Sequence, residues 1–122
     1  MNKIISILIL LLIPTGAFAA HWVAVDSGVV EIKLDSVRIE NRLWSYIDDN
    51  STTKFEPRNT YTYQYKAINH SEILINALCE VDSTKPLHTE FVIVFDGGSC
   101  YFQITYNFKT GEFSKLQVNG EA

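Results

Sequence analysis

The sequence predicts a small α+β domain, with an antiparallel sheet of about five strands, one helix over residues 35–50 and a short N-terminal β segment. Two observations support this fold class. Beyond residue 60, apolar and polar side chains alternate between short Asn- or Gly-containing turns, a pattern typical of strands joined by hairpins. Before that point, residues 35–50 place apolar side chains around about half of a helical wheel, which indicates an amphipathic helix.

The expected strands follow from this alternation and from one uniformly apolar run. They cover residues 22–25 and 29–34 near the N-terminus, and residues 60–68, 73–79, 91–95, 100–108 and 113–118 in the sheet. Residues 91–95 are apolar at every position, so we expect a central strand that is buried on both faces. One helix covers only one face. The N-terminal strands, a second copy or another protein would therefore have to cover the other.

Residues 35–50 also allow a second interpretation. As a helix, the segment has Asp35 or Ser36 available to cap its start. However, Arg38 lies near that start and Asp48 near the end, which is the unfavourable arrangement for a helix dipole. The alternative is a hairpin that turns at Glu40-Asn41. We favour the helix, because its apolar stripe is wide and continuous.

Residues 1–19 are typical of a secretory signal peptide. Lys3 gives a positive start, residues 4–13 form an apolar run, and Ala17-Phe18-Ala19 has the small-x-small pattern of a cleavage site. The apolar run is shorter than the ~20 residues that a membrane span needs, so a retained anchor is the weaker alternative. We therefore expect cleavage after Ala19 and no stable membrane insertion afterwards. Residues 20–122 would form a single small exported domain, either periplasmic or secreted.

Charge and composition exclude some function classes. The chain has 10 basic and 14 acidic side chains, a formal net charge of −4 at pH 7, and no cluster of Lys or Arg. Such a surface repels phosphate backbones, so nucleic-acid binding is not expected. The three histidines and two cysteines show no metal-ligand spacing, so we expect no metal and no other cofactor.

Cys79 and Cys100 are the only cysteines, and in a small exported domain such a pair usually forms a disulfide. Free thiols or an intermolecular bridge are the alternatives. If residues 91–95 formed a strand in a plain meander, the two cysteines would lie ~17 Å apart, at opposite ends of the sheet. A disulfide needs α-carbons within ~7 Å. A bridge would then require residues 81–88 to run back along the sheet, so bridge and plain meander exclude each other.

Two sets of side chains are candidates for a functional site. Tyr61, Tyr63 and Tyr65 share one face of a predicted strand, and tyrosine is enriched at recognition surfaces. The alternative is that this stripe is core beneath the helix. A cysteine paired with His88 would give a thiol–imidazole nucleophile, but a structural disulfide is the better explanation in this compartment. We identify no catalytic residues.

Three segments carry a resemblance: INALC at residues 75–79, DGGSCYF at residues 96–102 and VNGEA at residues 118–122. Together they resemble a group of small exported bacterial proteins of unknown function, over roughly residues 61–122. This resemblance implies that the two cysteines belong together. A weaker N-terminal likeness runs through Trp22, Leu34-Asp35-Ser36-Val37, Trp44 and Asp48. It is similar to surface-adhesin protein E, which implies a role in binding host matrix proteins.

These observations predict an exported, non-enzymatic protein-binding module whose partner is another protein or a second copy. One form is an inhibitor or immunity protein directed against a hydrolase of the cell envelope. Small size, acidity and a stapling disulfide suit that role. The alternatives are an adhesin-like surface factor and a thiol-dependent enzyme.

Overall fold

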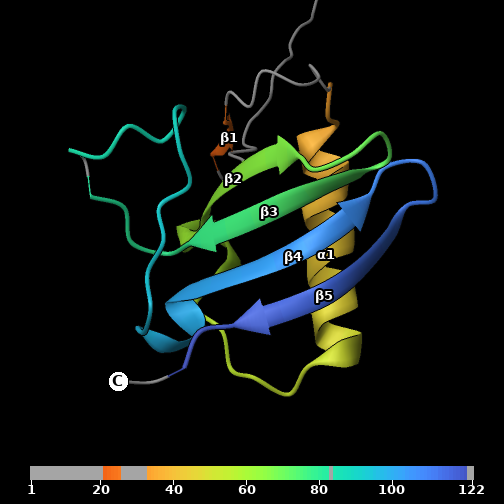
Figure 1. The fold of residues 1–122 in the computed structure, drawn as a ribbon. Helices are drawn as coiled ribbons and strands as arrows, with labels where there is room; N and C mark the ends of the chain where they lie inside the picture. Colours follow the sequence, from red (N-terminus) through yellow and green to blue (C-terminus); the bar gives the residue numbers. More distant parts are fainter. Residues whose placement is uncertain (1–20, 26–32, 83, 121–122) are drawn as a thin grey trace, which may run out of the picture.

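The computed structural model describes residues 21–25, 33–82 and 84–120, which form one sheet and one long helix (Figure 1). The five strands are ordered β1-β2-β3-β4-β5 across the sheet. β1 pairs parallel with β2, and the other pairs are antiparallel. The elements are β1 (Trp22–Ala24), α1 (Ser36–Asn50), η2 (Arg58–Thr60), β2 (Thr62–Ala67), β3 (Glu72–Leu78), η3 (Gly98–Cys100), β4 (Tyr101–Asn107) and β5 (Glu112–Val118). This arrangement confirms the predicted α+β class. None of the helices described here is long and apolar enough to cross a membrane.

Residues 36–50 form a helix, so the hairpin alternative is wrong. The Asp35 side chain caps the helix by accepting a hydrogen bond from the Arg38 backbone N–H at 3.3 Å. The helix ends where the N–H of Ser51 donates to the carbonyl of Ile47. Its buried side chains are Ile39, Leu43, Trp44 and Ile47. The continuous apolar stripe outweighs the unfavourable charge order along the helix, because burial stabilises the helix more than the dipole contributes.

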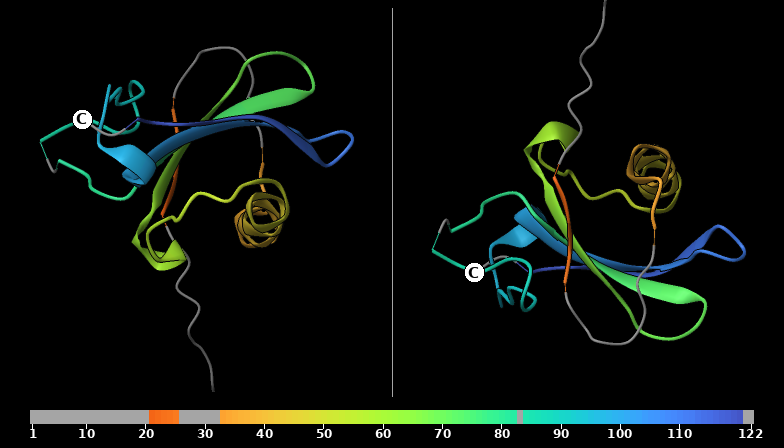
Figure 2. Two further views of the ribbon diagram at one scale, coloured as in Figure 1. Left: turned by 90° about the horizontal axis from the view of Figure 1, so that it is seen from below. Right: turned by 90° about the horizontal axis from the view of Figure 1, so that it is seen from above.

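The core lies between α1 and the face of the sheet that α1 covers (Figure 2). Alternate residues of each strand point to this face, as expected from the pleat. On the sheet side, the buried members of the core cluster are Tyr61, Tyr63, Ile73, Ile75, Ala77, Phe102, Ile104, Tyr106 and Phe113.

The predicted central strand at residues 91–95 is wrong. Those residues lie in the connection between β3 and β4, and the fifth strand is the N-terminal β1. β3 and β4 pair directly, from Glu72↔Asn107 to Leu78↔Tyr101, so no strand can lie between them. Far from being buried on both faces, the run has two exposed side chains, Ile93 and Phe95. The second expected N-terminal strand, at residues 29–34, lies largely outside the described residues.

Cys79 and Cys100 form a disulfide, with their α-carbons 4.9 Å apart. The cysteines lie where β3 ends and β4 begins, and the N–H of Cys79 donates to the carbonyl of Cys100 at 2.8 Å. The expected conflict between bridge and meander therefore does not arise, because residues 91–95 add no strand between β3 and β4. The bridge instead closes the base of a long connection, which emerges from that end of the sheet (Figure 1).

Candidate protein-contact surface

The tyrosine stripe belongs mainly to the core. Tyr61 is 1% exposed and Tyr63 is 0% exposed, while Tyr65 is half-buried. The Tyr63 ring stacks on Trp22 with centroids 4.5 Å apart, and its hydroxyl accepts a hydrogen bond from Trp44 Nε1 at 2.7 Å. The predicted binding role is thus wrong for Tyr61 and Tyr63, because the helix and its neighbours cover both rings. The core alternative describes them correctly.

The Tyr61 hydroxyl connects two segments that are distant in sequence. It donates to the carbonyl of Ser99 at 2.6 Å and accepts from the backbone N–H of Glu56 at 3.1 Å. Burial raises the pKa of both tyrosine hydroxyls, Tyr63 more strongly than Tyr61, although the hydrogen bonds from Trp44 and Glu56 oppose the shift. Both groups are therefore neutral hydrogen-bonding groups of the core.

The opposite face of the sheet carries an amide cluster formed by Gln64, Asn76 and Gln103. These residues face one another across β2, β3 and β4. Asn76 Nδ2 donates to Gln64 Oε1 at 2.9 Å, and Gln103 Nε2 donates to Asn76 Oδ1 at 3.2 Å. Gln64 and Asn76 are 0% and 3% exposed. Buried amides of this kind need further partners, which they find in the connection between β3 and β4.

The amide cluster holds the connection against the sheet. Gln64 Nε2 donates to the carbonyls of Leu87 and Glu90 at 2.7 and 2.8 Å. Gln64 Oε1 accepts from the N–H of Val92, and Asn76 Nδ2 donates to the carbonyl of Val92, both at 2.9 Å. Side chains of the sheet thus satisfy backbone groups that would otherwise pair in a strand ladder.

A second attachment follows a few residues later. Asn119, just after β5, donates its Nδ2 to the carbonyl of Val94 at 2.6 Å and to that of Asp96 at 3.0 Å. The connection then turns at Gly97, which has a φ of 94°. A Cβ atom at Gly97 would lie 2.6 Å from a ring carbon of Tyr101, so both the backbone and the space require glycine.

Residues 91–96, here called the contact segment, combine this fixed backbone with exposed apolar side chains. Ile93 is 56% exposed and Phe95 is 92% exposed. The Phe91 ring instead lies beneath the Lys66 ammonium, 4.7 Å from the ring centroid. Large apolar side chains that project from a tethered backbone are typical of an interaction surface.

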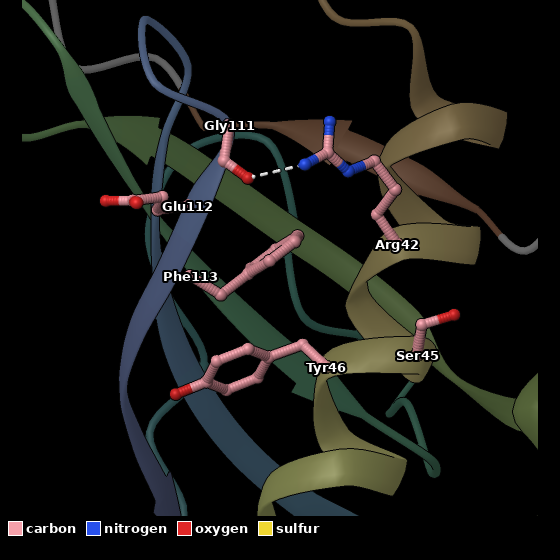
Figure 3. Close-up of a pocket in the computed structure, with 6 residues that line it drawn as sticks. All are labelled: Arg42, Ser45, Tyr46, Gly111, Glu112 and Phe113. Atoms are coloured by element: carbon pink, nitrogen blue, oxygen red, sulfur yellow. Dashed lines mark hydrogen bonds between the residues drawn. The ribbon is translucent and has the colours of Figure 1, made fainter.

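An open groove lies where α1 meets the β4–β5 hairpin, with a volume of about 470 Å³. Tyr46 and Phe113 form its apolar wall, and Arg42 closes one end by donating to the carbonyl of Gly111 at 2.9 Å (Figure 3). The Arg42 guanidinium, the cation beside the groove, is already bonded to the hairpin backbone. We therefore interpret the groove as the packing junction between the helix and the hairpin.

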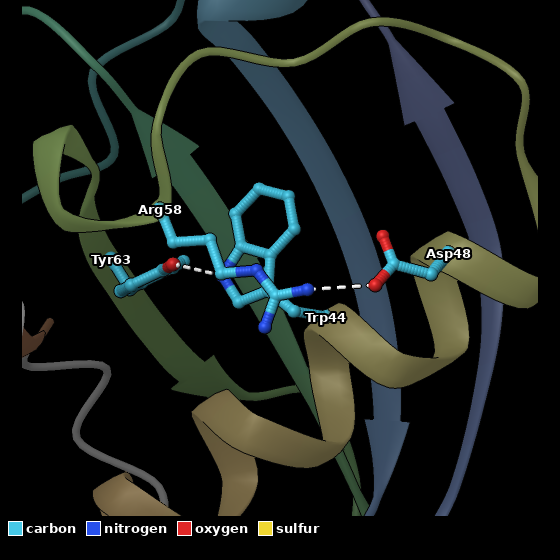
Figure 4. Close-up of polar contacts among 4 residues, drawn as sticks. All are labelled: Trp44, Asp48, Arg58 and Tyr63. Atoms are coloured by element: carbon cyan, nitrogen blue, oxygen red, sulfur yellow. Dashed lines mark hydrogen bonds and ion pairs between the residues drawn. The ribbon is translucent and has the colours of Figure 1, made fainter.

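A smaller, polar pocket of about 220 Å³ lies between the C-terminal half of α1 and the segment that follows the helix. Arg58 lies across the Trp44 indole at 5.6 Å from the ring centroid and forms an ion pair with Asp48 at 2.7 Å (Figure 4). Both charged side chains are exposed, so the pair contributes little by itself. The main role of Arg58 is to cover the outer edge of the buried Trp44 ring.

The residues of the possible thiol site do not form one in this structure. The sulfurs of Cys79 and Cys100 are bonded to each other, and His88 is an exposed residue of the connection between β3 and β4. A disulfide sulfur carries no thiolate and cannot act as the nucleophile. Within residues 21–25, 33–82 and 84–120, no three His, Cys, Asp or Glu side chains are placed to hold a metal ion.

The contact segment is the feature that sequence reasoning missed. Its apolar run suggested a buried strand, yet a signal was present elsewhere in the chain. Gln64 and Asn76 are amide residues within two predicted strands. An amide that is buried on a sheet face needs hydrogen-bond partners other than the backbone of the neighbouring strands. No protein-family model, curated protein or solved structure matches the chain.

Proposed function

We propose that this protein is an exported, non-enzymatic protein-binding module that contacts its partner through residues 91–96. The supporting observation is the contrast between the fixed backbone of this segment and its exposed side chains, above all Phe95. A segment already ordered before binding loses less conformational entropy on association. A projecting aromatic ring is also a common centre of binding energy.

The partner class that suits this surface is a hydrolase of the cell envelope, which the protein would inhibit as an inhibitor or immunity protein. The disulfide closes the base of the connection that carries the contact segment, and side-chain amides hold the segment itself against the sheet. An exposed aromatic ring on a tethered segment suits insertion into a cleft. The small size and net charge of −4 are compatible with a soluble inhibitor.

The proposed place of action is the periplasm or the extracellular medium, after cleavage behind Ala19. The Cys79–Cys100 disulfide supports this proposal, because such bonds persist in oxidising compartments. The resemblance of residues 75–79, 96–102 and 118–122 to small exported bacterial proteins supports it as well.

The test is affinity capture of the tagged protein from its native envelope, followed by mass spectrometry. We expect one stoichiometric hydrolase to co-purify with the wild type and to be lost from Phe95→Ser. The matched control is Val37→Ser, which changes another exposed apolar side chain, 57% accessible, on α1. Capture that persists in Phe95→Ser, or disappears equally in Val37→Ser, would refute the assigned surface.

A further inference from the structure

The backbone of the contact segment has one satisfied edge and one open edge. The N–H and C=O of Val92 and the C=O of Val94 all bond to amide side chains. In an extended chain, successive residues direct these groups to opposite sides. The N–H and C=O of Ile93 therefore point away from the amides, and they make no hydrogen bond within the described part of the chain. Residues 91–94 contain no turn or bend that would break this alternation, and a bend follows at Phe95.

The sequence of this segment is a palindrome. Phe91-Val92-Ile93-Val94-Phe95 reads the same in both directions, with Ile93 at its centre. A two-fold axis through Ile93 would pair two such segments antiparallel. Each Ile93 would then face its own copy, and each Val92 would face the Val94 of that copy. A two-fold axis pairs position 92 with 94 and position 91 with 95 whatever the sequence, and here every such pair is apolar, which favours the contact.

We infer that two copies of this chain associate through their contact segments, paired antiparallel about a two-fold axis at Ile93. The two Ile93 residues exchange N–H and C=O hydrogen bonds across the axis. Residues 91–95 carry no charge, whereas the same register sets Glu90 of each copy opposite Asp96 of the other, so the dimer should tighten as added salt screens these carboxylates. The inference shares its surface with the proposed function and adds the second copy as a partner.

The edges of the main sheet are less suited to this pairing. β1 has only three residues. The β4–β5 register shifts between Gln103 and Thr105, and Lys115 within β5 has a φ of 58°. Short and irregular edge strands are the usual protection against pairing between molecules. The edge at Ile93 is also short and lies outside the sheet, but no charged side chain or positive φ interrupts residues 91–94.

Pairing also bears on the proposed function, because one surface cannot hold a second copy and another protein together. The dimer is then the resting form, and a heterologous partner must displace one copy before it binds. Mass action makes the apparent affinity for that partner weaker as the concentration of this protein rises.

Analytical ultracentrifugation of the purified, oxidised protein tests the pairing without any other partner. We expect a dimer for the wild type, and monomers for Ile93→Glu and for Ile93→Lys, because each variant places two like charges at the axis. An equimolar mixture of the two variants should recover the dimer, since opposite charges then meet. Val37→Glu, the matched control on α1, should remain dimeric. Circular dichroism with thermal unfolding checks that every variant folds.

A wild type that stays monomeric from micromolar to sub-millimolar concentration would overturn the inference. So would dimers that persist in both single variants, or a variant mixture that remains monomeric. None of these results depends on the hydrolase. Partner capture by a monomeric wild type would leave the proposed function standing, and a dimer that captures nothing would remove only that function.

Discussion

Gln64 and Val92 are joined by a 2.9 Å hydrogen bond from the backbone N–H of Val92 to Gln64 Oε1, although they lie 28 positions apart in sequence. This bond attaches the contact segment to β2. The same side chain bonds to the carbonyls of Leu87 and Glu90. One buried glutamine thus orders much of the connection between β3 and β4.

Gln64→Leu should therefore loosen the connection while leaving the helix-side core intact. We expect a loss of about 1–3 kcal/mol in the free energy of unfolding, because several backbone groups lose their partner. Hydrogen exchange at the Val92 amide should accelerate at the same time. Urea denaturation and exchange mass spectrometry measure the two effects. Gln103→Leu is the control, because Gln103 bonds to Asn76 rather than to the connection. Equal exchange at Val92 in both variants would contradict the assignment.

Replacing both Cys79 and Cys100 by Ser should destabilise the domain by about 3 kcal/mol, according to the chain-entropy account of a loop of this length. Urea denaturation with and without a reductant gives the comparison. Titration of the unfolded, unreduced wild type should detect no free thiol. An unchanged midpoint in the double variant would show that the amide hydrogen bonds alone close the loop.

The stability cost of Tyr63→Phe should be largest at neutral pH and shrink at alkaline pH. At neutral pH, the buried Trp44 N–H loses its acceptor, at a cost of about 1–3 kcal/mol. Burial raises the pKa of Tyr63 in the folded state above the ordinary 10.0, so the unfolded chain loses its proton first as pH rises. Wild-type stability should thus be fully present below pH 10.0 and decline above it. The decline should be shallower in Tyr63→Phe, as melting temperatures measured across this range would show. Parallel curves would contradict the pKa argument.

Arg58→Ala should cost more than Asp48→Asn, although the two residues form one ion pair. The exposed pair is worth little, whereas Arg58 also covers the Trp44 ring. We expect a loss of about 1 kcal/mol or less for Arg58→Ala and almost none for Asp48→Asn. Urea denaturation of the two variants measures the difference. Equal losses in the free energy of unfolding would show that the ion pair, rather than the contact with the Trp44 ring, provides the stabilisation.

The regular part of the fold was predictable because its signals are local. Alternation in residues 100–108 placed Phe102, Ile104 and Tyr106 on one face, and that face is the one buried under α1. The helix was predictable from its apolar stripe, and the disulfide from the cysteine count and compartment. In each case, the pattern within a short window agrees with the final environment.

The contact segment could not be predicted, because its conformation depends on distant side chains. A uniformly apolar run has no period, so a buried strand and a tethered loop give the same pattern. The partners that decide between them are Gln64, Asn76 and Asn119. The tyrosines posed a similar problem. Their alternation predicted a shared face, but only the bonds to Trp44, Ser99 and Glu56 identify that face as core.

The amide attachment of the contact segment also limits how far assembly can proceed. A short, uncharged β-forming run with two open edges can add copies indefinitely and grow into a fibril. Here one edge is occupied by the side chains of Gln64, Asn76 and Asn119. They belong to the same folded chain and leave no backbone groups on that edge for an additional chain to pair with. Once the remaining edge is used, this segment offers no further template. If two copies pair as proposed, the side chains that hold the loop in place would limit this segment to a single pairing and protect it from polymerisation.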